Sequence, residues 1–426
     1  MHNKNYISVG IDVGSAFSFM TILAPDETVI LKPFKITHNN KDSLERAVSE
    51  IKKAEELYSL ESRTFLESTG IYHFPLFCYL VDCGFNASII NPIITHSTKN
   101  GNIRKVKNDK IDSKGIAKLG LSKDIPVSQF PAKLVLELRS LTRKYYDLTD
   151  ERSAHINKLK GDLHTVFPQY LDVFCDVTGK TSTMILRQYG TPDKILRGHK
   201  KTMIEKISKG LAKASERYEK LCAAANAAKT FGCQIDSIYF NIFLTLDLVE
   251  KLDSALDSIL NRIRQLITFN KNEKFIQQIK LLNTIPGVGF LTAVTIMCEI
   301  GDFSAFRNPK QLFAYFGLDP EVNESGKFVG TQLHMSKRGS RIARRAIFAV
   351  ALASIRTKRN GEGINPYLRK YYELKSGQKP KMVAIGAVMH KVCNIVFAVL
   401  RDEKAFELRS PEEHCKQYQR PALAAA

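Results

Sequence analysis

The stretch Gly10-Ile11-Asp12-Val13-Gly14-Ser15 decides the fold, because it places one carboxylate at the end of a short apolar run, Tyr6 to Ile11. Such a run predicts a buried strand, and an acidic side chain at its tip has little structural purpose. At a strand end it meets solvent and any carboxylates that neighbouring strands carry to the same edge. The chain offers three candidate partners for it: Glu67, Asp109 and Asp112.

The first 130 residues predict a mixed α/β domain with the element order βββαβαβ. Strands are expected at Tyr6–Ile11, Phe17–Leu23, Thr28–Ile36, Thr64–Leu66 and Ala87–Ile90, and helices at Asp42–Leu57 and Tyr72–Cys83. Short turns between the first three strands predict an antiparallel meander. This order is that of a ribonuclease-H-like fold, which brings strand ends together, so we expect Asp12 and Glu67 to lie close in space.

Asp109 and Asp112 are spaced i,i+3, which puts both carboxylates on one face of a helix. Two Mg²⁺ ions that lie about 3.5–4 Å apart need several oxygen ligands. We therefore predict that Asp12, Glu67, Asp109 and Asp112 bind two Mg²⁺ ions, with Mn²⁺ as the alternative. Taken singly, Asp12 also fits a turn residue, and Asp109 with Asp112 fits a solvated helix start; the set of four favours the metal site.

The composition favours a polyanionic partner. The 426 residues predict two or three domains, and 63 Lys and Arg against 43 Asp and Glu give a net charge of +20. This excess indicates nucleic acid first and an anionic membrane second. No run approaches the ~18 apolar residues of a membrane span, and no signal peptide is visible. Eight cysteines without a Cys-x-x-Cys pair favour a reducing compartment, so we expect a cytoplasmic, nucleoid-associated protein without a membrane partner.

Residues 131–275 predict long helices with two heptad seams. One seam comprises Leu134, Leu138, Leu141, Tyr145 and Leu148, and the other comprises Val249, Leu252, Leu256, Ile259, Ile263 and Leu266. Such seams pair as coiled coils within or between chains. We expect a spacer or dimerisation arm, with a helical bundle inside one chain as the alternative.

The C-terminal part carries the densest positive charge. Fifteen Lys and Arg lie between Lys327 and Lys391, against only Glu362 and Glu373, which is a footprint for nucleic acid. Upstream, Gly287 and Gly289 predict a helix-hairpin-helix turn whose backbone N–H groups face a phosphate. Arg341, Arg344 and Arg345 are expected along one side of a helix. The predicted contacts to nucleic acid are Lys105, Lys107, Gly287, Gly289, Lys327, Lys337, Arg338, Arg341, Arg344 and Arg345.

Taken together, the motifs resemble the insertion-sequence-110 family of DEDD transposases, which includes the Piv-like DNA invertases. Any one motif is weak, but their ordered set is specific, and it covers both ends of the chain. The middle region resembles the family only as a longer helical segment. The matching pieces are Gly10-Ile11-Asp12, Glu67-Ser68-Thr69-Gly70, Asn91-Pro92, Asn108-Asp109-Lys110-Ile111-Asp112, Ile285-Pro286-Gly287-Val288-Gly289, Phe316-Gly317-Leu318-Asp319-Pro320, Glu324-Ser325-Gly326 and Ser336-Lys337-Arg338-Gly339.

The resemblance implies a RuvC-like domain over residues 1–130 that binds Mg²⁺ through the four acids, a coiled-coil region over 131–275 and a transposase domain over 276–406. It also implies that Ser325 is a nucleophile that forms a phosphoserine link to DNA, although the sequence alone reads Ser325-Gly326 most simply as a turn. Family members form dimers and tetramers whose active sites combine two subunits. Many use a structured non-coding RNA to select donor and target DNA. Residues 407–426 are predicted to be a disordered tail.

Three other functions compete with this one. A metal nuclease of the Holliday-junction type would cut with the acids and water alone, and a non-catalytic scaffold would only bind nucleic acid. A sugar-kinase-like ATPase is suggested by Asp12-Val13-Gly14-Ser15, which also resembles a phosphate loop. It is disfavoured because no second Asp-x-Gly loop follows, and because it leaves Asp109 and Asp112 without a role.

Overall fold

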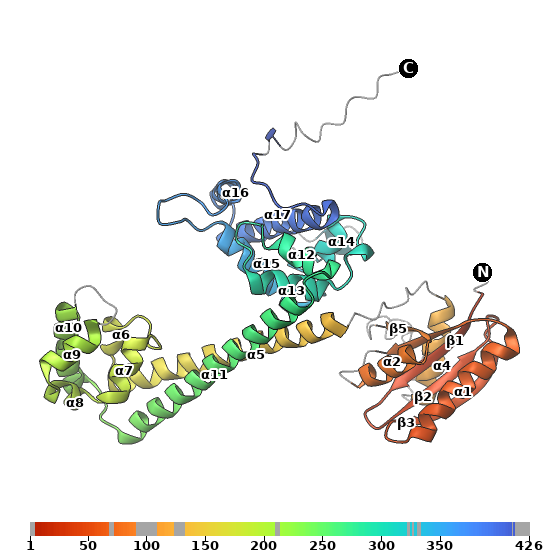
Figure 1. Cartoon of the computed structure of the whole chain (residues 1–426), viewed down its shortest axis with the longest axis horizontal. Helices are drawn as coiled ribbons and strands as arrows, with labels where there is room; N and C mark the ends of the chain where they lie inside the picture. The colour runs from red at the N-terminus through yellow and green to blue at the C-terminus, as the bar shows by residue number, and fades with distance from the viewer. Residues whose placement is uncertain are drawn as a thin grey trace, which may run out of the picture. The chain divides into compact units, whose positions relative to one another are not determined.

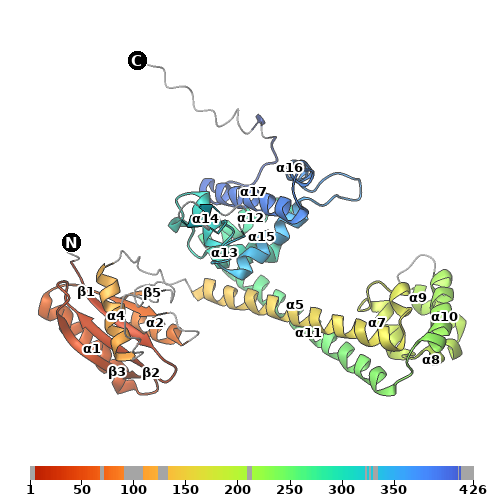
Figure 2. The same cartoon turned by 180° about the vertical axis from the view of Figure 1, so that it is seen from behind.

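The computed structural model describes residues 5–67, 72–90, 109–122, 133–208, 214–321, 324–325, 328–329, 334–410 and 412–413. The chain divides into two compact units, residues 1–131 and 132–426, and each is described by itself. The predicted middle and C-terminal regions fall together in the second unit. Figures 1 and 2 show the elements of both units from opposite sides.

The first unit is built on a five-stranded mixed sheet of order β3-β2-β1-β4-β5. Its strands are β1 (Ile7–Val13), β2 (Phe17–Leu23), β3 (Val29–Thr37), β4 (Ser62–Glu67) and β5 (Asn86–Ile90). The first three strands pair antiparallel, as predicted, whereas β1 with β4 and β4 with β5 pair parallel. The mixed sheet and the order of its elements agree with the predicted ribonuclease-H-like domain.

Helices cover both faces of this sheet. α1 (Lys41–Tyr58) and α2 (His73–Asp82) share one apolar core with Ile7, Val9 and Ile11. α4 (Asp109–Ser122) packs on the other face, against Tyr6 and Phe65. Figure 1 shows α1 in front of the sheet, and Figure 2 shows α4 in front of it. Alternate residues of β1 therefore face two different cores, as expected for a strand buried on both sides.

Two helices of 34 residues each, α5 (Lys133–Val166) and α11 (Asp236–Phe269), pack along each other in the second unit. They pair within one chain, which is one of the two arrangements expected from their seams. Leu138, Leu148 and Leu256 are buried seam residues, whereas Leu141 and Ile259 are only partly buried. That the pair supercoils, or pairs with a second chain, stays a prediction.

A small helical cluster lies between α5 and α11 in the sequence and joins their ends. We call it the tip module, residues 167–208 and 214–235. It contains α6 (Tyr170–Val173), α7 (Lys180–Gln188), α8 (Pro192–Arg197), α9 (Lys200–Ser208) and α10 (Ala214–Phe231). Its core surrounds the fully buried Tyr170 and includes Leu163 of α5 and Ile242 of α11.

The rest of the second unit is a helical domain. Its elements are α12 (Lys274–Leu282), α13 (Phe290–Ile300), a 3₁₀ turn (Phe303–Ala305), α14 (Pro309–Tyr315), the strands β6 (Glu324–Ser325) and β7 (Phe328–Val329), α15 (Arg341–Ser354), α16 (Pro366–Ser376) and α17 (Lys381–Asp402). The core of this domain also includes Leu134 and Leu138 of α5. The start of α5 is therefore part of it.

α17 corrects one expectation from the sequence. It has 22 residues, and the mean hydropathy of its most apolar 18-residue stretch is 2.0, so it is long and apolar enough to cross a membrane. Its side chains at Val388, Val392 and Val396 are fully buried in the domain core. Residues 407–410, predicted to start a disordered tail, line a cavity of about 350 Å³ together with α16 and α17.

Candidate metal and serine sites

The parallel pairing of β1 and β4 brings two of the predicted acids to one edge of the sheet. Ile11 lies opposite Leu66, so the next residues along the two strands are Asp12 and Glu67. In-register residues of parallel strands point to the same face. Asp12 is half-buried and Glu67 is only 7% exposed. A carboxylate this buried at a strand end is unusual unless it is paired or coordinates a metal.

The contacts of α4 show that Asp12 lies on the face of the sheet that α4 covers. The Tyr6 hydroxyl donates to the Gly120 carbonyl at 2.7 Å, and Ser8 Oγ donates to the Ala117 carbonyl at 2.7 Å. At Gly10 a Cβ would come within 2.3 Å of the backbone of Ala117, so glycine is required for this close approach. Each step of two residues along β1 moves the contact about one turn back along α4.

The next step along β1 brings Asp12 to the first turn of α4, where Asp109 and Asp112 lie. A second contact agrees with this placement. Lys110 Nζ lies 5.8 Å from the ring centre of Phe19, and Phe19 is the antiparallel partner of Asp12 on β2. The fold thus gathers the strand ends of Asp12 and Glu67 and the start of α4 at one edge and on one face. Asp109 is exposed and Asp112 is half-buried.

All four candidate ligands are carboxylates, which are the donors that Mg²⁺ and Mn²⁺ prefer. Within the described ranges, no three His, Cys, Asp or Glu side chains are close enough together to hold a metal ion. The fold therefore brings together the backbone positions of the acids rather than a closed set of ligand atoms. Lys105 and Lys107, predicted to bind nucleic acid beside the acids, lie outside the described residues.

Ser325 lies in the second unit, on β6. This strand pairs antiparallel with β7, and Ser325 lies opposite Phe328. Farther out in the same segment, Glu321 N donates to His334 O at 2.7 Å and Ser336 N donates to Asp319 O at 2.8 Å, so these two stretches of chain also lie side by side. The sequence alone suggested a simple turn at Ser325-Gly326. The structure places Ser325 at the end of a two-residue strand, and Gly326 and Lys327, on which the rest of that turn falls, lie outside the described residues.

A buried carboxylate joins α13 to α5 and to the start of α15. Glu299 of α13 is 3% exposed and accepts two hydrogen bonds from Arg143 of α5, at 2.8 and 3.0 Å. Ser340 Oγ also donates to Glu299, at 2.7 Å, and accepts from the Ala343 N–H, so it caps the start of α15. Burial raises the pKa of Glu299, but the hydrogen bonds from Arg143 and Ser340 outweigh it and hold the pKa below its usual value.

Sequence reasoning missed this network. The signal that could have revealed it is the position of Glu299, the one charged residue in the apolar run Phe290–Ile300. Such a residue needs a partner when the helix is buried. The partners themselves could not be found from spacing, because Arg143 and Ser340 are 156 and 41 residues away.

The predicted basic contacts have different environments. Arg341 and Arg345 share one side of α15 and both pair with Asp150 of α5, at 3.2 and 2.7 Å. Arg344 differs from the expectation that all three line one side, because it donates to the carbonyls of Phe316 and Gly339. Burial lowers the pKa of Arg344. Lys337 and Arg338 are exposed.

The two glycines of the predicted helix-hairpin-helix join α12 to α13. Gly287 has a φ of 96° and lies against Ser354, whose hydroxyl donates to the Pro286 carbonyl at 3.0 Å. Gly289 is the exposed residue that precedes α13. The turn thus has one structural glycine and one that faces solvent. Its binding to DNA stays a prediction.

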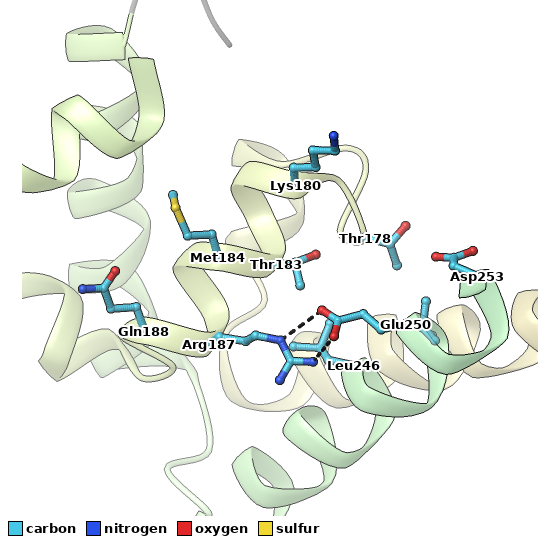
Figure 3. A pocket seen from close by; sticks show the side chains of 10 residues that line it. Thr178, Lys180, Thr183, Met184, Arg187, Gln188, Leu246, Glu250 and Asp253 are labelled. Atoms are coloured by element: carbon cyan, nitrogen blue, oxygen red, sulfur yellow. Dashed lines mark hydrogen bonds and ion pairs between the residues drawn. The ribbon is translucent and has the colours of Figure 1, made fainter. Parts of the chain in front are cut away.

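A cavity of about 590 Å³ lies between α7 and α11 (Figure 3). Arg187 crosses it and pairs with Glu250 at 2.9 Å and with Asp247 at 2.7 Å. None of the predicted site residues lines this cavity. It lies away from the acids and from the serine hairpin in the sequence, and we assign no chemistry to it.

Comparison with known proteins assigns the family. Residues 9–168 match a model of DEDD transposases of the IS110 type, described as a transposase, and residues 279–373 match the model described as the transposase IS116/IS110/IS902 family. The chain belongs to the IS110 family of transposases. It is therefore a member of a class of DNA-transposing and DNA-recombining enzymes. Its DEDD domain indicates the use of a divalent metal ion.

Individual relatives agree with this membership. The chain is 23% identical over 286 residues to an uncharacterised 43.6 kDa protein of insertion element IS110 from Streptomyces coelicolor, and the matched segment covers 66% of each chain. It is 30% identical over 177 residues to the pilin gene-inverting protein of Moraxella bovis, covering 41% of this chain and 52% of that one. It is 26% identical over 188 residues to the transposase of element IS1111A from Coxiella burnetii, covering 43% and 50%. The matched segments thus span between half and two thirds of these relatives.

Proposed function

We propose that this IS110-family transposase cleaves and rejoins DNA strands to move an insertion element. The observation that carries the proposal is the meeting of the strand ends of Asp12 and Glu67 with the first turn of α4. This meeting point lies inside the matched residues 9–168. An edge that gathers acids in this way can bind metal cations. Such cations suit the chemistry of phosphodiesters, which needs positive charge held beside the reacting phosphate.

We further propose that Asp12, Glu67, Asp109 and Asp112 hold Mg²⁺, with two ions bound. When bound, Mg²⁺ neutralises the charge that develops on the phosphate and on the leaving oxygen. Glu67 is buried, whereas Asp109 is exposed, so Glu67 would help to position the site and Asp109 would complete it when DNA arrives.

Ser325 would be the nucleophile. Its hydroxyl oxygen attacks the phosphorus of a DNA phosphodiester and loses its proton to solvent, while the strand oxygen leaves and takes up a proton. The product is a phosphoserine diester, which keeps the energy of the broken bond. Attack by a strand hydroxyl on this diester reverses the step, rejoins the DNA and returns the proton to Ser325. A hairpin strand suits this role, since it fixes the serine backbone.

The partners that we propose are donor and target DNA, a structured non-coding guide RNA, and further copies of this chain in a dimer or tetramer. Fifteen Lys and Arg against two acids between Lys327 and Lys391 supply the charge for nucleic acid. Binding through such a segment falls steeply with salt because it releases counterions. A cytoplasmic location near the nucleoid follows from these partners.

A covalent-trapping assay tests this function. The full chain is mixed with Mg²⁺, labelled element-junction DNA and RNA transcribed from the flanks of the element, and the products are separated on denaturing gels. We expect a DNA-linked protein band from the wild type that is absent from Ser325→Ala and Asp12→Ala. The matched controls are Ser258→Ala and Asp26→Ala, which change exposed residues of α11 and of the β2–β3 turn, and both should keep the band.

Two outcomes would contradict the proposal. Free cleaved DNA that persists in Ser325→Ala but disappears in Asp12→Ala would mean a hydrolytic metal nuclease. DNA binding without any cleavage by the wild type, unchanged in Asp12→Ala, would mean a non-catalytic scaffold.

A further inference from the structure

A second pocket lies in the first unit, on the face of the sheet that α1 and α2 cover. It has a volume of about 330 Å³, and Ser15, His38, Tyr72, Leu76 and Tyr79 are among its lining residues. We call it the edge pocket. Its volume is at the small end of ligand sites in proteins, so it suits one flat ring system rather than a large ligand.

The edge pocket opens at the same edge of the sheet as the acids. Ser15 lies in the tight turn after β1, where Gly14 N donates to Phe17 O at 3.1 Å. His38 follows the end of β3, which reaches this edge because Phe17 pairs with Thr37. Ser15 comes three positions after Asp12, which is at most about 10 Å of extended chain. The acids therefore lie on one face of this edge, and the pocket lies on the other face, close by.

The lining of the edge pocket favours a neutral aromatic ligand over a phosphate. Two tyrosine rings and an imidazole surround it, and among the described lining residues there is no Lys or Arg. Burial raises the pKa of Tyr79, and the hydrogen bond with Cys83 and the nearby Glu45 raise it further, so the phenol stays neutral. Without a cationic side chain in this lining, a phosphate would lack a counter-charge, whereas an uncharged base needs none.

The polar groups of the edge pocket are fixed in position. His38 Nε2 is 2.7 Å from Ser18 Oγ, which holds the imidazole ring, and within the described residues Nδ1 has no hydrogen-bond partner. The hydroxyl of Ser15 is exposed at the turn. A fixed ring nitrogen and a rotatable hydroxyl between aromatic surfaces are the features that hold a base by stacking and by hydrogen bonds to its edge.

We propose that the edge pocket binds one unstacked nucleobase of the DNA strand whose phosphate lies at the carboxylates. This inference rests on the proposed function, since it assumes that the acids face a DNA phosphate. Successive bases of one strand are about 3.4 Å apart along a duplex, so a pocket within about 10 Å of Asp12 takes a base a few nucleotides from the cleaved bond. Capture of this base fixes the register of the strand at the acids.

Tyr72 and Phe74 provide a matched pair of variants. Both are aromatic residues at the start of α2, 47% and 38% exposed, so truncation of either should leave the fold intact. Tyr72 lines the edge pocket and Phe74 does not. We expect Tyr72→Ala to weaken binding of a single-stranded junction oligonucleotide about tenfold, the effect of losing one stacking ring. Phe74→Ala should leave binding unchanged, and Tyr72→Phe should restore it.

The position of the captured base is found with 2-aminopurine, moved one nucleotide at a time through the oligonucleotide. The full chain is used in EDTA, so that no cleavage occurs and the readout does not depend on catalysis. We expect a change of fluorescence at one position for the wild type and Phe74→Ala, and none for Tyr72→Ala. An abasic nucleotide at that position should weaken the wild type about tenfold and leave Tyr72→Ala unaffected.

Several results would overturn the inference. These are no position that responds in the wild type, equal losses in Tyr72→Ala and Phe74→Ala, or an abasic penalty that is the same in the wild type and Tyr72→Ala. Displacement of the signal by micromolar ATP would assign the edge pocket to a free nucleotide instead of a DNA base. Failure of the proposed function looks different: covalent trapping gives no band, while capture of the base is still measured in EDTA.

Discussion

Replacement of Arg143 by methionine isolates the contribution of the buried Glu299. The variant keeps the length of the side chain but removes both hydrogen bonds to the carboxylate. Removal of one partner from a buried ion pair typically costs 3–5 kcal/mol. Because the Arg143 side chain is 53% exposed, water solvates part of the pair, and the lower end of that range applies.

Protonation of Glu299 sets an upper limit to the part of this cost that comes from leaving an unpaired carboxylate buried. A carboxyl group with the ordinary pKa of 4.5 that is buried without a partner can take up a proton and become neutral. This protonation costs about 1.36 kcal/mol for each pH unit above that pKa. At pH 7 the limit is about 3.4 kcal/mol, and at pH 4.5 it falls below about 1 kcal/mol. The expected loss is therefore about 3 kcal/mol at pH 7 and most of it disappears at pH 4.5.

The direction of the pH dependence differs between the two proteins. In the wild type the pKa of Glu299 is lowered, so its contribution to stability is present above pH 4.5 and is lost as the pH falls through the folded-state pKa. In Arg143→Met the folded-state pKa rises above 4.5. The variant is then most stable below pH 4.5 and loses stability as the pH rises through that raised pKa.

Differential scanning calorimetry of the full chain at pH 7.0 and pH 4.5 measures this difference. For a unit of this size, each kcal/mol moves the Tm by about 2 °C, so we expect a loss of about 6 °C at pH 7.0 and about 1–2 °C at pH 4.5. The control is Lys144→Met, the same loss of charge at the exposed neighbouring residue of α5, which should change neither value. An equal loss at both pH values would refute the electrostatic reasoning and leave only lost packing.

Three further outcomes are expected. Gly10→Ala should displace α4 from β1 and abolish trapping with a loss of more than about 2 kcal/mol, measured by thermal unfolding, whereas Gly115→Ala on the open side of α4 should stabilise by up to about 1 kcal/mol. Asp150→Asn should release Arg341 and Arg345 and tighten DNA binding, with a steeper salt dependence in a filter-binding titration; an unchanged slope would mean that these arginines do not contact phosphate. Chelation of the metal should abolish trapping but not DNA binding measured by gel shift, and cleavage that survives EDTA would exclude a metal role.

The sheet of the first unit could be predicted because each strand is a short apolar run between turn residues. The edge that gathers the acids followed from the order of those strands, since parallel neighbours must end together. What the sequence could not supply was the close approach of α4. It depends on the missing side chain of Gly10 and on hydrogen bonds from Tyr6 and Ser8 to residues more than 100 positions away.

The second unit was harder to predict, because its important contacts are long-range. Arg344 looked like its neighbours Arg341 and Arg345 in the sequence, but it supports the loop carbonyls of Phe316 and Gly339. Local spacing describes a helix surface and does not reveal which loop packs on it. At Ser325 the sequence indicated a turn but not the strand pairing beside it, since strands of two residues carry no periodicity.

The way in which the tip module joins α5 and α11 has a consequence for how this chain arose. Cys233 N donates to Thr165 O at 3.0 Å, so the chain leaves the module beside the point where it enters. Residues 169–278, which neither family model matches, contain most of it. A segment with adjacent ends can be acquired, lost or exchanged between genes without rerouting the rest of the polypeptide. Related elements are therefore free to diversify at this one site, provided that the apolar ends of α5 and α11 stay covered.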